Sequence, residues 1–138
     1  MYLTYLEYKA MGGALDETTF NDLEFEAEAI INWYTFNRLK NDTSFPVEIK
    51  RLVKYLINLF HIKEGVLNSS SNGDTQGAAS NIASQSNDGV SISYNVLSAS
   101  EIAQSCKEEA GNACQKYLQG VMNEAGRLLL YRGVYPNE

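Results

Sequence analysis

The chain has 138 residues, of which 44% are hydrophobic, and a formal net charge of −6. This length suits a single domain that buries about two-thirds of the surface of its unfolded chain. No apolar run approaches the ~18 residues of a membrane span, and residues 1–13 lack the pattern of a signal peptide. We therefore expect a protein without a membrane partner that is cytosolic where it is made, and its acidity disfavours a grip on duplex DNA.

Local signals predict two helices in the first 36 residues. Thr4 and Glu7 fit a capping box, which begins a short helix that Gly12-Gly13 ends. Asp16 is placed to cap a second helix that reaches about Phe36. Its apolar residues recur at helical spacing and comprise Phe20, Leu23, Ala27, Ile30, Ile31 and Tyr34.

A third amphipathic helix follows Pro46, which suits the first helical position, and should end near Gly65. Residues 68–81 have almost no apolar content, so we expect a flexible loop from about 66 to 81.

Residues 82–95 predict a β-hairpin, because apolar and polar residues alternate from Val90 to Asn95. A three-residue turn at 87–89 would place Ile82 opposite Tyr94, and we prefer it to a two-residue Asp-Gly turn. A lone hairpin is marginal in water. It must therefore lie on the helices or join strands of another copy, and the sequence leaves both open.

A final helix should be capped by Ser98 or Ser100, with Gly111 permitting a close helix contact. The sequence thus predicts a mostly α fold: a small bundle of about four helices over residues 1–120, with an inserted β-hairpin and an extended C-terminal tail at 121–138. The apolar face of the last helix comprises Ile102, Cys106, Ala110, Ala113, Tyr117 and Val121.

The charges are unevenly distributed along the chain. Residues 1–28 carry seven acidic residues against one lysine, whereas residues 38–64 carry six cations against three acids. Two interpretations stay open at this point. The charges cover solvated helix faces, or an acidic surface pairs head to tail with a basic surface on a neighbouring copy.

No motif for catalysis or cofactor binding is present, so we expect neither an enzyme nor a bound cofactor. The single histidine, His61, leaves too few ligands for a zinc site, and no metal is expected. Cys106 and Cys114 lie ~12 Å apart along one predicted helix, too far for a disulfide. They are predicted to be small buried side chains.

Five segments resemble the head–tail connector, or adaptor, proteins of tailed bacteriophages and prophages. They are "YLTYLEYKAMGG", "LDETTFNDLEFEAEAIINWYTFNRL", "PVEIKRLVKYLINL", "SQSNDGVSISYN" and the terminal "LLLYRGV". The first three are generic helix patterns. The ordered combination of the hairpin motif with the terminal motif is more specific, and the likeness spans nearly the whole chain.

The resemblance implies a structural virion protein at the head–tail interface, made in the host cytoplasm. Such proteins form a homo-oligomeric ring, commonly a dodecamer, beneath the portal protein. The ring extends the channel for genomic DNA, without sequence-specific binding, and carries the stopper or tail-completion protein. The alternative is a small regulatory module that binds a phage or host protein through its tail.

The resemblance also implies site residues. The portal-docking tail matches Leu128, Leu129, Leu130, Tyr131, Arg132, Gly133 and Val134. The hairpin at subunit contacts matches Ser84, Ser86, Asp88, Gly89, Ser91 and Tyr94. We expect a partner to bury the tail, although Leu128–Leu130 folding back onto their own bundle is the alternative. Among the acidic residues, Glu24 and Glu28 are hypothesised to face the channel or a neighbouring subunit.

Overall fold

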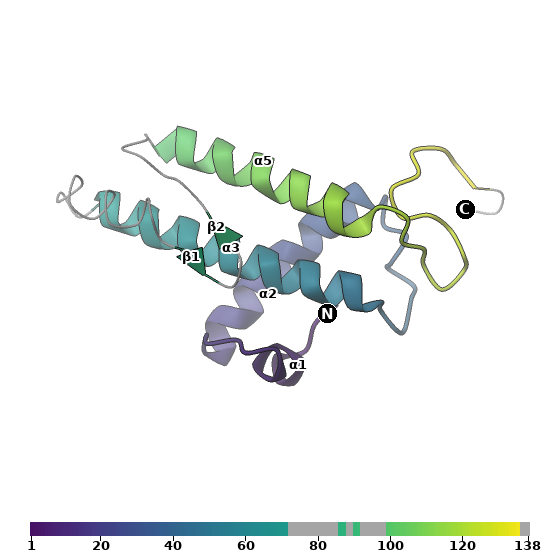
Figure 1. Ribbon diagram of the computed structural model, residues 1–138, viewed down its shortest axis with the longest axis horizontal. Helices are drawn as coiled ribbons and strands as arrows, with labels where there is room; N and C mark the ends of the chain where they lie inside the picture. The colour runs from purple at the N-terminus through teal and green to yellow at the C-terminus, as the bar shows by residue number, and fades with distance from the viewer. Residues whose placement is uncertain (72–85, 88–89, 92–98, 136–138) are drawn as a thin grey trace.

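The computed structural model describes residues 1–71, 86–87, 90–91 and 99–135, and these residues are mostly helical (Figure 1). They contain four helices: α1 (Tyr5–Ala10), α2 (Glu17–Tyr34), α3 (Val47–Ser71) and α5 (Ala99–Leu118). Helix α3 packs against both α2 and α5, and runs antiparallel beside α5. The predicted helical bundle is therefore confirmed.

The first two helices begin where their capping residues predict. The Glu7 amide donates to the Thr4 hydroxyl at 3.2 Å, and the Thr4 amide donates to the Glu7 carboxylate at 2.9 Å. The Thr19 amide donates to the Asp16 carboxylate at 3.1 Å. These bonds satisfy backbone donors that the first turn of a helix leaves without an intrahelical partner.

The core lies where α3 meets its two neighbouring helices. Helix α3 buries Ile49, Leu52, Val53 and Leu56 completely, and α5 buries Cys106 and Cys114 as expected. Burial raises the pKa of the Cys106 thiol to about 11 and that of Cys114 to about 12. Among the described residues, no helix is long and apolar enough to cross a membrane.

Helix α3 runs further than the sequence predicts. It continues past Gly65 to Ser71, and Val66 is buried. Val66 continues the apolar face of the helix, and its packing outweighs the weak helix propensity of the exposed glycine. Residues 66–71 of the expected loop are therefore helical, and residues 72–81 lie outside the described residues.

Two short strands pair antiparallel, β1 (Ser86–Asn87) and β2 (Val90–Ser91). Ser86 lies opposite Ser91 and Asn87 opposite Val90, which corresponds to the two-residue connection and not to the three-residue turn that we preferred. The longer hairpin over residues 82–95 stays a prediction. Its residues Ser84, Asp88, Gly89 and Tyr94 lie outside the described residues.

Two glycines allow close approaches in the bundle. A Cβ on Gly111 of α5 would collide with the hydroxyl of Tyr34, so the predicted close helix contact at this position is present. A Cβ on Gly13 would overlap the buried ring of Tyr8. Gly65, by contrast, has open space around it.

Alanine at position 13 and alanine at position 65 should therefore have opposite effects on stability. We expect Gly13→Ala to lower the free energy of unfolding by about 1–3 kcal/mol, because the ring of Tyr8 cannot move without disturbing the core. The matched variant Gly65→Ala should raise it by up to ~1 kcal/mol through helix propensity. Urea unfolding of both variants measures the difference, and equal effects would contradict the packing described for Gly13.

Candidate functional site

The C-terminal segment, residues 119–135, folds back onto the end of the bundle beside the connection between α2 and α3 (Figure 1). The Leu129 amide donates to the Val121 carbonyl at 3.0 Å, and Met122 pairs with Leu128 in an antiparallel bridge. The side chain of Leu129 is completely buried in the core. The expectation that a partner buries the tail is therefore wrong for Leu129, because its own bundle supplies the apolar contacts.

Arg38 fastens this segment to the bundle. Its guanidinium lies in the connection between α2 and α3, and the residue is only 7% exposed. Nη1 donates to the carbonyls of Leu128 at 3.1 Å, Leu129 at 3.2 Å and Tyr131, and Nη2 donates to the Gly133 carbonyl at 2.7 Å. A planar guanidinium holds five N–H donors in a fixed fork and can bind several carbonyls of one segment, whereas a lysine ammonium has three donors around a single nitrogen.

Aromatic rings surround the same guanidinium. The Arg38 Cζ atom lies 5.2 Å from the ring centroid of Phe36, 5.1 Å from that of Tyr135 and 5.9 Å from that of Tyr131. These distances suit cation–π attraction. Phe36 and Asn37 adopt left-handed backbone angles, with φ of 54° and 59°, which is unusual for a phenylalanine. The chain therefore turns sharply before Arg38.

A second contact joins the segment to residues 42–44. The Glu124 carboxylate accepts from the hydroxyl of Ser44 at 2.8 Å, from its amide at 2.8 Å, and from the amide and hydroxyl of Thr43 at 3.2 and 3.0 Å. The bonds from Ser44, followed by those from Thr43, lower the pKa of Glu124 to about 2. The Asn123 side chain also donates to the Arg38 carbonyl at 3.1 Å.

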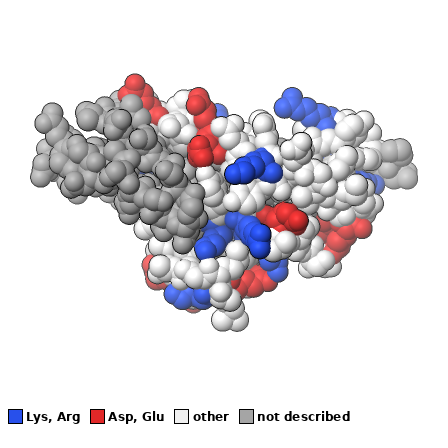
Figure 2. All heavy atoms as spheres, in the orientation of Figure 1, with Lys and Arg blue, Asp and Glu red and all other residues white. Residues whose placement is uncertain are grey.

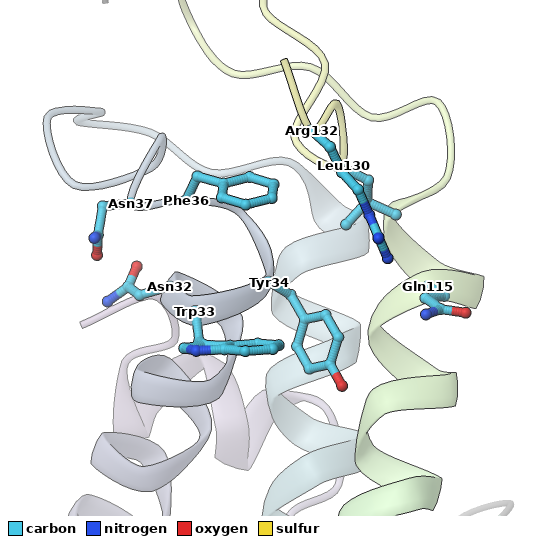
Figure 3. A pocket seen from close by; sticks show the side chains of 8 residues that line it. All are labelled: Asn32, Trp33, Tyr34, Phe36, Asn37, Gln115, Leu130 and Arg132. Atoms are coloured by element: carbon cyan, nitrogen blue, oxygen red, sulfur yellow. The ribbon is translucent and has the colours of Figure 1, made fainter. Parts of the chain in front are cut away.

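An open cleft of about 530 Å³ lies between the end of α2, α5 and the C-terminal segment (Figure 3). The rings of Trp33, Tyr34 and Phe36 form one side, and Arg132 reaches down from the C-terminal segment beside Leu130. The cleft is lined by Asn32, Trp33, Tyr34, Phe36, Asn37, Gln115, Leu130 and Arg132. This mixture of aromatic rings, amides and one cation suits recognition of a protein surface.

A second cleft of about 500 Å³ shares Trp33 and Tyr34 with the first and lies between α2 and α5. Its walls are mainly apolar, and its two charged residues are Glu26 and Lys107. Glu26 lies 3.5 Å from Lys63 in an ion pair. Within the described residues, no group of three His, Cys, Asp or Glu side chains could hold a metal ion.

The most exposed aromatic side chains of the described residues are not among the predicted site residues. Phe25 is 76% exposed and Trp33 is 74% exposed, and both lie on the face of α2 opposite its buried residues. Their helical spacing could have revealed them, because they fall outside the predicted apolar face. Exposed rings of this size are typical anchors of protein interfaces.

The two predicted acidic site residues have different surroundings. Glu24 is buried and accepts from the Tyr2 amide at 2.9 Å, and burial raises the pKa of its carboxyl. The hypothesis that Glu24 faces a channel or a neighbour is therefore wrong, because it caps the start of its own chain. Glu28 is half-buried and pairs with the N-terminal amine at 3.0 Å. It remains a candidate surface residue.

Most of the predicted docking residues remain accessible on the folded-back segment. Val134 is 83% exposed, Tyr131 is 48% exposed, and Arg132 and Leu128 are also exposed, whereas Leu130 and Gly133 are half-buried. Of the predicted hairpin residues, only Ser86 and Ser91 are described, and they pair with each other. Of the predicted docking residues, Leu130 and Arg132 line the first cleft.

Comparison with protein-family models, curated proteins and solved structures gives no match for this chain.

Replacing Arg38 tests whether it holds the segment. We expect Arg38→Ala to lower the free energy of unfolding by roughly 2–3 kcal/mol, since a charged donor to several carbonyls is lost. Arg38→Lys should recover little of this loss. Urea unfolding measures the loss, and limited proteolysis should show earlier cleavage within residues 121–135. Arg132→Ala, an exposed arginine in the same segment, is the control and should change stability by less than about 0.5 kcal/mol. Equal effects of the two alanine variants would contradict the role of Arg38.

Glu124 should make the free energy of unfolding depend on pH. Its pKa in the folded state is about 2, below its ordinary value of 4.5, so its carboxylate adds stability that is present above pH 4.5 and is lost as the pH falls towards 2. Glu124→Gln should therefore lower stability at pH 7 and flatten its decline over this range. Unfolding curves at several pH values measure the slope. Parallel curves for the variant and the wild type would exclude this contribution.

Proposed function

We propose that this protein is a structural virion protein: a ring-forming head–tail connector that docks beneath the portal, extends the DNA channel and carries the stopper protein. The resemblance of the hairpin and terminal motifs supports this class. The observation that carries the proposal is the way Arg38 presents the terminal motif. Three of its residues, Tyr131, Arg132 and Val134, are exposed together on a segment that the bundle already holds.

The segment docks in place, without leaving the bundle. Leu129 and the four carbonyls bound by Arg38 face inward and anchor it, whereas Val134 and Tyr131 face solvent. A segment ordered before binding loses less conformational entropy when a partner covers it. Arg132, an exposed guanidinium beside these apolar groups, can form forked hydrogen bonds with a carboxylate of the portal.

The acidic balance of the chain suits a DNA channel. A net charge of −6 repels the phosphates of a passing duplex and disfavours its adhesion. Glu28, at the surface of α2, is a candidate for the channel side. No enzymatic step is part of this role, which consists of binding, alignment and passage.

A regulatory module is the second candidate function. The two clefts that share Trp33, about 530 and 500 Å³ in volume, favour it because they would hold a peptide of a phage or host protein. In that case binding would depend on Trp33 and would not require a portal protein.

Co-purification with the portal protein of the same genome tests the proposed function. We expect the wild-type chain to bind the portal and to form a ring that electron microscopy resolves beneath it. Val134→Asp should weaken portal binding about tenfold or more without changing the melting temperature, because it places a charge in a desolvated contact. Met122→Asp is the matched control, since Met122 is a 52% exposed apolar residue of the same segment outside the docking motif.

A portal that does not retain the wild-type chain, or equal binding by the Val134→Asp and Met122→Asp variants, would contradict docking through this segment.

A further inference from the structure

We infer that copies of this chain associate head to tail, with an aromatic stripe on α2 of one copy in a cationic cleft of the next. The aromatic stripe consists of Asp22, Phe25, Ala29 and Trp33. The cationic cleft, about 360 Å³ in volume, is lined by Met11, Arg51, Lys54, Tyr55, Asn58 and Tyr117. The inference deepens the proposed function by naming the contact between subunits of the ring.

The aromatic stripe lies on the exposed face of α2, and its last residue, Trp33, also lines the two clefts beside α5. Phe20, Leu23, Ala27 and Ile31 bury one face of α2, and the stripe lies on the opposite face at the spacing i, i+3, i+7, i+11. Its two rings are about three-quarters exposed. With 150–250 Å² in each ring, burying both would remove on the order of 300 Å² of apolar surface from water. That suits the centre of a standard interface, whose remainder is polar rim.

The cationic cleft combines aromatic side chains, which the rings of the stripe can contact, with a cation that Asp22 can pair with. Its apolar walls include Tyr55 and Tyr117, whose ring centroids lie 5.9 Å apart. Arg51 is exposed at the cleft and has no ion pair with any described residue. Lys and Arg side chains gather in the middle of the face that α3 and α5 present in Figure 2.

Charge complementarity selects a second copy as the occupant. Asp22 is exposed, lies one turn before Phe25 and has no ion pair within the described part of the chain. When Phe25 packs against the paired rings of Tyr55 and Tyr117, Asp22, one turn away on the same stripe, can pair with Arg51 at the rim of the cleft. An arginine beside both a carboxylate and an aromatic ring gains from each.

The directions of the two surfaces make the contact heterologous. The stripe faces away from α3, whereas residues of α3 and α5 line the cleft, and α2 lies behind these two helices in Figure 1. Two copies therefore cannot each place a stripe in the other's cleft at the same time. Each added copy leaves one stripe and one cleft uncovered, so association continues until a ring closes or a filament grows.

Complementation between two variants tests this geometry. The stripe variant carries Phe25→Ser and Trp33→Ser, and the cleft variant carries Arg51→Glu. Sedimentation velocity from micromolar to millimolar concentration should show higher oligomers of the wild type and association of each variant weakened about tenfold or more. An equimolar mixture should form heterodimers and nothing larger, because only one intact stripe and one intact cleft are present.

The charge swap Asp22→Arg with Arg51→Asp in one chain should restore oligomers that either single substitution weakens. The inference is overturned if the wild type stays monomeric at millimolar concentration, if the variants assemble like the wild type, or if their mixture behaves like the separate variants. Because the substituted residues are exposed, the melting temperature of each variant should equal that of the wild type, and circular dichroism measures it.

The contact between copies and the binding to a portal can fail separately. If the chain assembles by complementation but no portal retains it, the proposed function fails and the contact stands. If portal-bound rings incorporate the stripe and cleft variants as readily as the wild type, the contact fails and the proposed function stands.

Discussion

The hydrogen bonds from the guanidinium of Arg38 to the carbonyls of the C-terminal segment constrain the whole end of the bundle. They join residue 38 to residues 128–133, which are remote in sequence. Because Arg38 is almost fully buried, these carbonyls replace the water that the charge would otherwise need. Leu129 completes the attachment by filling the core, and the segment becomes one wall of the cleft beside Trp33.

This attachment changes what the apolar C-terminus can do. A tail that hangs free would lose much conformational entropy on docking, and its leucines would be exposed until then. Here the bundle already orders the segment and leaves only part of it at the surface. The interaction surface is therefore an ordered segment next to an aromatic cleft. A partner binds it more tightly because no conformational entropy is lost in ordering the backbone.

The sequence predicted what short-range chemistry decides. The caps at Thr4 and Asp16 were readable because a cap and its amides lie within three residues, and the apolar period placed the buried faces of α2, α3 and α5. Glu24 also carried a signal that was overlooked. It lies four residues after Phe20, on the buried face, where a carboxylate needs backbone donors such as the Tyr2 amide.

Contacts between distant segments could not be predicted in this way. Nothing in the neighbourhood of Arg38 shows that its partners lie beyond residue 127, whereas the family resemblance implies that the tail docks on an external partner. The period of α2 identifies Phe25 and Trp33 as exposed, but a period does not reveal what covers an exposed ring. The continuation of α3 beyond Gly65 likewise depends on the packing of Val66, a tertiary effect.

Hydrogen exchange at the Leu129 amide of the free wild-type chain tests the central claim most directly. This amide donates to the Val121 carbonyl within the C-terminal segment, and the burial of the Leu129 side chain in the core shields the bond from water while the segment lies on the bundle. If Arg38 holds the segment before any partner binds, the amide exchanges on the same timescale as the core of α3. Exchange at the rate of an unstructured peptide would show that the segment is free in solution, and the account would be wrong.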